Sequence, residues 1–192
     1  MIISSPMNES ELRNLMYTGQ LESTKLPMVI RYPRGEGMMP EWKTPMKEIE
    51  IGKGRKLRDG QDIAILSFGH PGNFAAAAIR DLKNDGLTPG HYDMRFAKPL
   101  DEVLLHEACQ RYEKLLTVED GTVEGGFGSA ILEFMNRHGY KNEVRILGIP
   151  DRLVEHGTPK ELVRECGYDA EGIANTIREM LKEKITVSTL LG

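Results

Sequence analysis

The chain has 192 residues, of which 40% are hydrophobic and 28% charged, as in a soluble globular protein with one full domain and part of another. Its net charge of -4 argues against nucleic acid as a partner, because binding a phosphate backbone requires an excess of Lys and Arg. No apolar run approaches the roughly 20 residues that cross a bilayer, and the first residues lack a signal-peptide pattern. We therefore expect a cytoplasmic protein without membrane contact.

Residues 1–35 predict a strand, a helix capped by Asn8 or Ser10, and a second strand at Met28–Ile30. Two strands and one helix bury too little surface to fold alone, so this segment is interpreted as the tail of a larger α/β domain. Residues 36–47 are rich in Gly and Pro and are interpreted as an interdomain linker.

Residues 48–184 predict a separate domain. Ile49 and Ile51, followed by glycine turns, indicate a hairpin that leads into a strand at Ile63–Leu66. Beyond it, strands are expected at 91–96, 115–119 and 144–147, and helices at 73–82, 101–112, 129–137, 159–164 and 172–183. Helices between strands imply right-handed crossovers and a mainly parallel sheet covered on both faces, which is a three-layer α/β/α fold. Residues 185–192 are interpreted as a tail.

Two arginines flank a proline in Arg31-Tyr32-Pro33-Arg34-Gly35. Pro33 fixes its own φ and favours extended geometry at Tyr32, so both guanidinium groups leave the strand end in defined directions. A guanidinium fork matches the oxygens of a phosphate, and each charge-assisted hydrogen bond contributes roughly 1.5–3 kcal/mol. An anion site is one hypothesis, and ion pairs across a domain junction are the alternative.

The loop after the strand 115–119 contains Gly125, Gly126 and Gly128, and its free N–H groups could bind phosphate. Glu119 and neighbouring carboxylates oppose this, and the glycine spacing matches neither G-x-G-x-x-G nor a P-loop. We interpret these glycines as structural, allowing positive φ and close approach of a helix or a second subunit. Further along, Asp93 and Arg95 share a strand face and could pair with each other or with a neighbouring subunit.

Histidines and cysteines give no catalytic motif. His156 and His70 lie in predicted loops, where a lone histidine more often makes a structural hydrogen bond than acts as a catalyst. Asp151 follows the last predicted strand. Cys109 and Cys166 lack metal-ligand spacing and are expected to be reduced, buried thiols. We therefore assign no catalytic and no metal-binding residue.

Seven short blocks, in this order along the chain, resemble the C-terminal portion of the 1-deoxy-D-xylulose-5-phosphate synthase family, which are transketolase-like thiamine-diphosphate enzymes. The blocks are Arg31–Gly35, Ile51–Gly54, Asp93–Phe96, Lys98–Asp101, Thr117–Asp120, Gly125-Gly126 with Gly128-Ser129, and Gly148–Asp151, and the resemblance ends at Gly157-Thr158. The Thr-Val-Glu strand end and the paired glycines also occur in transketolases and in the β-subunits of 2-oxoacid dehydrogenases.

The resemblance implies a transketolase C-terminal domain at 48–184, with about five strands of which one is an antiparallel edge strand. Residues 1–35 would then be a remnant of the pyrimidine-binding middle domain. The implied reaction joins pyruvate to glyceraldehyde 3-phosphate, releases CO2 and yields 1-deoxy-D-xylulose 5-phosphate for isoprenoid, thiamine and pyridoxal biosynthesis in bacteria. Arg34 is the best candidate for binding the acceptor phosphate, and Arg31 is a weaker one.

Thiamine diphosphate and Mg²⁺ are implied for the full-length enzyme, where other domains of the same chain bind them, so this fragment is expected to bind neither and to be inactive. The family's third domain chiefly supports a homodimer. Interface or packing roles are therefore implied for Glu119, Gly125, Gly126, Gly128, Asp151 and His156.

Two alternatives remain open at this point. The chain could be the matching part of a 2-oxoacid dehydrogenase β-subunit or of a transketolase; the dehydrogenase would be distinguished by an acyl-carrier partner. It could also be a stand-alone interaction module that scaffolds or regulates a partner.

Overall fold

The computed structural model describes residues 1–39 and 42–190, with side chains up to residue 182. Pro40 and Glu41 of the predicted linker and the last two residues of the predicted tail lie outside the described residues. The strands are β1 (Ile2–Ser4), β2 (Met28–Ile30), β3 (Arg55–Arg58), β4 (Ile63–Phe68), β5 (Gly90–Asp93), β6 (Phe96–Lys98), β7 (Lys114–Thr122) and β8 (Glu143–Ile149). The α-helices are α1 (Glu9–Gly19), α2 (Pro71–Leu82), α3 (Glu102–Arg111), α4 (Phe127–His138), α5 (Pro159–Glu165) and α6 (Ala170–Leu190), and a short 3₁₀ helix spans Lys83–Asp85.

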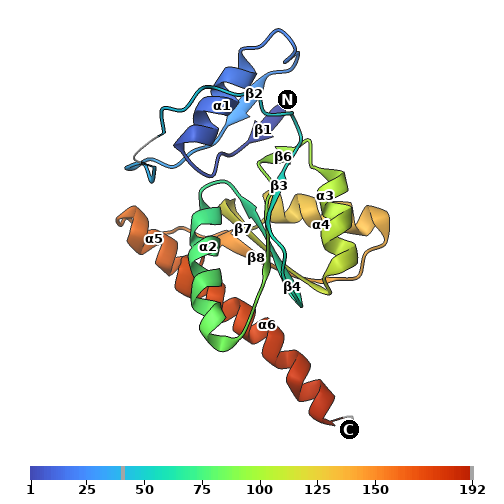
Figure 1. Ribbon diagram of the computed structural model, residues 1–192. Helices are drawn as coiled ribbons and strands as arrows, with labels where there is room; N and C mark the ends of the chain where they lie inside the picture. Colours follow the sequence, from blue (N-terminus) through green and yellow to red (C-terminus); the bar gives the residue numbers. More distant parts are fainter. Residues whose placement is uncertain (40–41, 191–192) are drawn as a thin grey trace.

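The larger sheet has five strands in the order β3-β5-β4-β7-β8 (Figure 1). Strand β4 pairs in parallel with β5 and β7, and β7 pairs in parallel with β8, whereas β3 runs antiparallel to β5 at the edge. The prediction of a mainly parallel five-stranded sheet with one antiparallel edge strand is confirmed.

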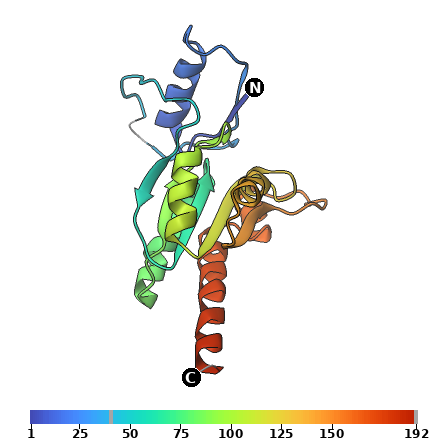
Figure 2. The ribbon, with the colours of Figure 1, turned by 90° about the vertical axis from the view of Figure 1, so that its right-hand side faces the viewer.

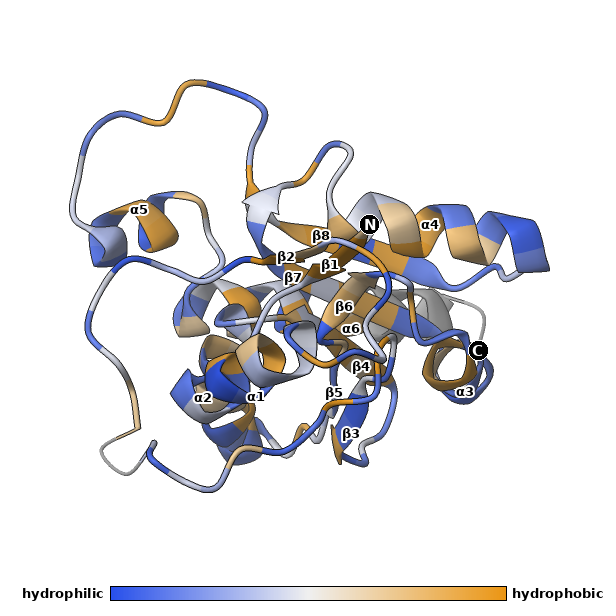
Figure 3. Ribbon diagram, turned by 90° about the horizontal axis from the view of Figure 1, so that it is seen from above, coloured by the Kyte–Doolittle hydropathy of each residue, from blue (hydrophilic) through white to orange (hydrophobic). Residues whose placement is uncertain are grey.

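Helices cover both faces of this sheet (Figure 2). Ile63 and Ile65 of β4 face the helices α2 and α6, whereas Ala64 and Leu66 face α3 and α4, because successive side chains of a strand point to opposite faces. Figure 3 shows the hydrophobic colouring concentrated on the strands and on the helices beside them. The predicted three-layer α/β/α arrangement is confirmed.

The predicted hairpin at Ile49 and Ile51 is wrong, because the strand begins later, at Arg55, and pairs with β5 rather than with β4. Ile49 instead joins a small core with Ile2, Leu15 and Phe96, and its N–H donates to Thr18 Oγ1 at 2.9 Å. The alternating pattern around Ile49 thus reflects packing against α1 and not a strand.

The predicted strand 91–96 is divided into two at Arg95, which has a positive φ of 55°. After this turn, β6 leaves the large sheet and pairs antiparallel with β1, which completes a second sheet in the order β2-β1-β6. Asp93 and Arg95 consequently do not pair with each other: Asp93 binds Arg55 and Arg95 binds Glu11.

Polar side chains cap the starts of three helices. Asn8, one of the two predicted caps of the first helix, and Asp101 accept hydrogen bonds from the first turns of α1 and α3, and Thr158 forms a capping box with Glu161 at α5. Helix α6 continues through residues 185–190 and projects away from the sheet (Figure 1). Over residues 1–39 and 42–190, none of the helices combines the length and apolar character needed to traverse a lipid bilayer.

Candidate functional site

A pocket of about 300 Å³ lies where the first segment meets the carboxyl ends of the large sheet's strands. Ligands of open α/β sheets bind at this edge. The lining comes from the residue after β1, from β2 and the residues after it, from the residue before α2 and from the end of β7. The lining residues are Ser5, Ile30, Arg31, Tyr32, Pro33, His70 and Asp120.

Arg31 connects the two parts of the chain. Its backbone N–H donates to Ser4 O at 2.9 Å, and its carbonyl accepts from Ser5 Oγ at 2.9 Å, which fixes the backbone beside β1. Its guanidinium reaches the other domain, where Nη2 donates to the carbonyl of Asp120 at 2.5 Å and Cζ lies 5.7 Å from the centroid of the Phe68 ring. The half-buried Arg31 is therefore engaged by protein groups on both sides.

Arg34 differs from Arg31 in its surroundings. It is exposed, it follows Pro33 directly, and within the described part of the chain it makes neither a hydrogen bond nor an ion pair. The alternative in which both arginines form ion pairs across a domain junction is not what the geometry shows, since Arg31 contacts a carbonyl and a ring. The guanidinium of Arg34 is available to an anion.

His70 and Asp120 complete the polar side of the pocket. The ring of His70 stands edge-on to Phe74 at 5.0 Å between centroids, and burial lowers the pKa of His70, although the carboxylates of Asp120 and Glu9 act in the opposite direction. Asp120 Oδ1 accepts a hydrogen bond from the Tyr168 hydroxyl at 2.8 Å. His70 is thus favoured as a neutral lining residue, consistent with a structural role.

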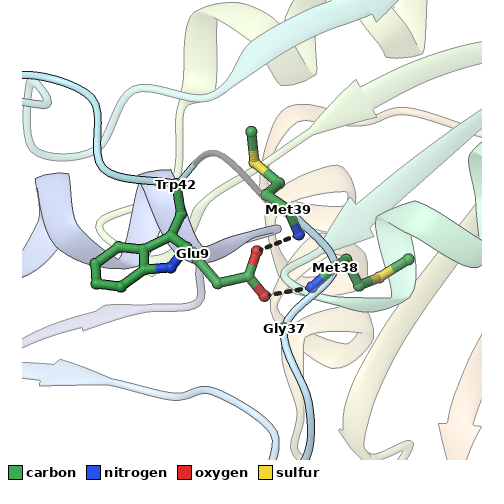
Figure 4. Close-up of a pocket in the computed structure, with 5 residues that line it drawn as sticks. All are labelled: Glu9, Gly37, Met38, Met39 and Trp42. Carbon is green, nitrogen blue, oxygen red and sulfur yellow. Dashed lines mark hydrogen bonds between the residues drawn. The ribbon is translucent and has the colours of Figure 1, made fainter.

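The residues after Arg34 are held against α1 by Glu9 (Figure 4). Glu9 Oε1 accepts from the N–H of Met38 at 2.7 Å, and Oε2 accepts from the N–H of Met39 at 3.0 Å. Together with Gly37 and Trp42, these residues line a second, open pocket of about 400 Å³. A carboxylate that accepts two backbone hydrogen bonds fixes the chain direction at this point.

Further contacts extend this attachment along α1. Arg13 Nη1 donates to the carbonyl of Thr44 at 2.9 Å, its guanidinium lies 5.4 Å from the centroid of the Trp42 ring, and Asn14 Oδ1 accepts from the N–H of Lys47 at 2.9 Å. The described part of the predicted linker 36–47 is therefore packed on the helix. Nothing in its Gly- and Pro-rich composition indicated these contacts.

Glu119 lies at the end of β7 and is completely buried, with a relative exposure of 0%. Its Oε1 accepts from the N–H of Gly128 at 2.9 Å, and its Oε2 is buried without a hydrogen-bond partner in the described structure. A Cβ on Gly126 would lie 2.6 Å and 2.7 Å from the two carboxylate oxygens. Gly126 therefore leaves room for this carboxylate, and Gly128 donates its N–H to it. The structural role of these glycines at an interface stays a prediction.

Gly125 adopts a φ of 70°, and its N–H donates to Ser129 Oγ at 2.9 Å, so it supplies the turn before α4. Asp151 and His156 are exposed in the connection between β8 and α5, and neither lines the two pockets described above. The location of these residues at a subunit interface stays a prediction.

In the part of the chain that the structure describes, no group of three or more His, Cys, Asp or Glu side chains is placed to hold a metal ion. Both cysteines are free thiols; burial raises the pKa of Cys109 to about 11, which keeps it protonated and unreactive.

The fold and the junction site define a class of protein. Residues 52–173 match the family described as transketolase, C-terminal domain, and the chain belongs to this family. A solved split-gene transketolase, described as an inactive β4 tetramer, is similar with a TM-score of 0.81 and 27% identity over 95% of this chain and 58% of that one. A transketolase from Pichia stipitis, at 19% identity and a TM-score of 0.61 over 93% of this chain and 25% of that one, shares the fold.

Proteins related by sequence identify a narrower group within this family. The chain is 57% identical over 180 residues to 1-deoxy-D-xylulose-5-phosphate synthase of Cytophaga hutchinsonii, and 52% identical over 182 residues to that of Bacteroides thetaiotaomicron. It is 44% identical over 184 residues to the synthase of Aquifex aeolicus. These alignments cover 94–95% of this chain and 28% of each relative. Within the transketolase family, the chain is thus a C-terminal portion of the 1-deoxy-D-xylulose-5-phosphate synthase type.

Proposed function

We propose that this chain supplies the acceptor-phosphate-binding arginine and the C-terminal domain of a 1-deoxy-D-xylulose-5-phosphate synthase. The full enzyme would join pyruvate to glyceraldehyde 3-phosphate, release CO2 and form 1-deoxy-D-xylulose 5-phosphate, which leads to isoprenoids, thiamine and pyridoxal in bacteria. The observation that carries the proposal is the exposed guanidinium of Arg34, which no described protein group engages.

The surroundings of Arg34 prepare it for a phosphate. Arg31 fixes the chain before it, Pro33 restricts the backbone beside it, and Glu9 holds Met38 and Met39 after it. A positioned guanidinium binds phosphate oxygens through charge-assisted hydrogen bonds. Holding the phosphate would keep the aldehyde carbon within reach of the attacking carbon, and such positioning lowers the reaction barrier.

The resemblance to the synthases implies thiamine diphosphate and Mg²⁺ in the full enzyme. Thiamine diphosphate supplies an electron sink for the carbanion that remains when CO2 leaves a 2-oxoacid. The described residues do not fit this group, since they include no cluster of metal ligands, and we assign none of them to it. Its binding is proposed to belong to other domains of the full-length chain.

The proposal extends to the isolated chain, which we expect to bind no thiamine diphosphate and to be inactive. A split transketolase chain described as an inactive β4 tetramer, 58% of which matches this chain, supports this expectation. Calorimetry of the purified chain with thiamine diphosphate and Mg²⁺ tests it, and tight uptake would contradict it.

We also propose the division into a middle-domain remnant at 1–35, a linker at 36–47 and a C-terminal domain at 48–184. The full enzyme is proposed to be a cytoplasmic homodimer, with Glu119, Gly125, Gly126, Gly128, Asp151 and His156 in interface or packing roles. Sedimentation of the full-length enzyme would test the dimer.

The deciding experiment substitutes Arg34→Ala in the full-length enzyme. The KM for glyceraldehyde 3-phosphate should rise about 30- to 100-fold, as expected for the loss of charge-assisted hydrogen bonds, with the KM for pyruvate unchanged. Turnover of unphosphorylated glyceraldehyde should not change. The matched control is Lys25→Ala, an exposed cation of the same segment, which should leave both acceptors unaffected.

An Arg34→Ala enzyme with wild-type use of glyceraldehyde 3-phosphate would contradict the proposal. A full-length protein that required an acyl carrier as its acceptor would favour the 2-oxoacid dehydrogenase alternative. Absence of any condensation activity would favour the interaction module.

A further inference from the structure

The guanidinium of Arg31 and the carboxylate of Glu119 face each other across Gly121. A Cβ placed on Gly121 would lie 2.7 Å from Arg31 Nη2 and 2.8 Å from Glu119 Oε2. Both atoms therefore lie beside the same point, and only a residue without a side chain leaves room for them. The same Glu119 oxygen has no hydrogen-bond partner among the described groups.

A buried carboxylate with one unpartnered oxygen requires compensation. Removing a carboxylate from water without a partner is strongly unfavourable, and charges attract more strongly in a low-dielectric interior. The Gly128 N–H satisfies Oε1 of Glu119, and the guanidinium across Gly121 is the cation that faces Oε2. Glu119 thus favours the position of Arg31 at the end of β7.

We propose that Glu119 is a positioning residue for the acceptor site and that it acts through Arg31. This inference rests on the proposed function, because it concerns the arginine three positions farther along the chain, Arg34. Glu119 belongs to the C-terminal domain, so this domain would take part in acceptor binding without touching the acceptor.

The connection from Glu119 to Arg34 is short and stiff. The guanidinium of Arg31 is held by the Asp120 carbonyl and faces Glu119, and the backbone of Arg31 is held by Ser4 and Ser5. Only Tyr32 and Pro33 separate Arg31 from Arg34, and Pro33 restricts the backbone of both residues. A displaced Arg31 would therefore displace the Arg34 guanidinium, and hydrogen bonds to phosphate depend steeply on geometry.

The test uses Glu119→Gln in the full-length enzyme. Glutamine keeps the shape and an acceptor for the Gly128 N–H but removes the charge that faces Arg31. The KM for glyceraldehyde 3-phosphate should rise about tenfold, with kcat and the KM for unphosphorylated glyceraldehyde unchanged. Gly121→Ala should act in the same direction, because the added methyl group would displace the guanidinium. Glu124→Gln, an exposed carboxylate in the same loop, is the matched control and should have no effect.

A double-mutant cycle separates positioning from a merely structural role. If Glu119 acts through Arg31, Glu119→Gln should add nothing to the KM of an Arg31→Ala enzyme. Additive effects, or an equal rise in KM for the phosphorylated and unphosphorylated acceptors, would overturn the inference. Should Glu119→Gln fold poorly, the same cycle with Gly121→Ala decides between the same outcomes.

The outcome for Arg34→Ala distinguishes the two proposals. If that substitution leaves acceptor use unchanged, the proposed function fails. If it weakens use of the phosphorylated acceptor while Glu119→Gln and Gly121→Ala have no effect, the inference about Glu119 fails and the proposed function stands.

Discussion

Glu11 and Arg95 form a two-point ion pair although they are 84 positions apart in the sequence. Arg95 Nε donates to Glu11 Oε2 at 3.2 Å and Arg95 Nη2 donates to Oε1 at 2.5 Å, while Arg55 Nη1 lies 3.0 Å from the same Oε1. Glu11 is only 5% exposed. Because Glu11 lies on α1 and both arginines belong to the larger domain, this cluster attaches the first segment to that domain.

The first prediction concerns the strength of this attachment. Glu11→Gln should lower the free energy of unfolding of the purified chain by about 2–4 kcal/mol, because it leaves two partly buried guanidinium groups without their shared carboxylate. Urea denaturation followed by circular dichroism measures this change. Glu22→Gln, an exposed carboxylate of the same segment, should change the value by less than about 0.5 kcal/mol. Equal effects of the two substitutions would contradict a stabilising role for the pair.

The larger sheet could be predicted from the sequence because patterns among neighbouring residues indicate its strands and the helices between them. Apolar runs such as Ile63–Leu66 predicted buried strands, and apolar residues at helical spacing predicted the helices between them. The positions of Ile49 and Arg95 could not be predicted in the same way. Both are set by contacts with α1, which lies far away in the sequence and leaves no local periodicity.

The candidate site, like the fold, could be predicted only in part from the sequence. The Arg-Tyr-Pro-Arg spacing predicted an anion site, and Arg34 is available for one. The different surroundings of Arg31 arise from Asp120, 89 positions away, and could not be inferred from the motif. Glu119 was predicted to have a structural role, but its unpartnered oxygen and its place near Arg31 depend on contacts between segments far apart in the sequence.

The second prediction concerns acid stability and His91. Its ring is 2% exposed, and Nε2 lies 2.9 Å from Ser67 Oγ. Burial lowers the pKa of His91 to about 4, and the Arg55 charge acts in the same direction. A histidine in the unfolded chain titrates near pH 6.5, so the unfolded state binds more protons between these values. The contribution of His91, at most roughly 3 kcal/mol, is present above about pH 6.5 and is lost as the pH falls toward 4.

Comparison of wild type with His91→Gln isolates this contribution. Asp93 also titrates in this range, since burial raises its pKa to about 6. The effect of Asp93 on stability has the opposite sign. Because Asp93 is present in both proteins, it does not disturb the comparison. Urea unfolding between about pH 7 and pH 4 should show a smaller loss of stability for His91→Gln than for wild type. His156→Gln, at an exposed loop position, should keep the wild-type pH dependence. Parallel curves for wild type and His91→Gln would show that His91 is not the titrating group.

The third prediction concerns packing beneath the start of α4. A Cβ on Gly128 would lie 2.6 Å from Ile146 Cγ2 and 2.8 Å from Thr117 Oγ1. Gly128→Ala should therefore lower the free energy of unfolding by about 1–3 kcal/mol through overpacking. The matched comparison is the same substitution in an Ile146→Ala background, where the nearest methyl group is gone and the loss should shrink. An unchanged loss in that background would exclude steric overlap with Ile146 as the cause.

The fourth prediction concerns the segment that follows Arg34. Glu9→Gln should weaken the two hydrogen bonds to Met38 and Met39, because a neutral amide offers one acceptor oxygen in place of two charged ones. The amide hydrogens of these methionines should then exchange with solvent about 10- to 100-fold faster, as measured by NMR or mass spectrometry.

Gly37→Ala should accelerate the same exchange, since its Cβ would lie 2.7 Å from Glu9 Oε1. Glu36→Gln removes an exposed carboxylate next to Gly37 and should leave the exchange unchanged. Wild-type protection of Met38 and Met39 in the Glu9→Gln chain would mean that other contacts, such as those of Arg13 with Thr44, are sufficient to hold the segment. Faster exchange would show that the hydrogen bonds of Glu9 on α1 hold the segment after Arg34. The segment before Arg34 is held separately, by the contacts of Arg31.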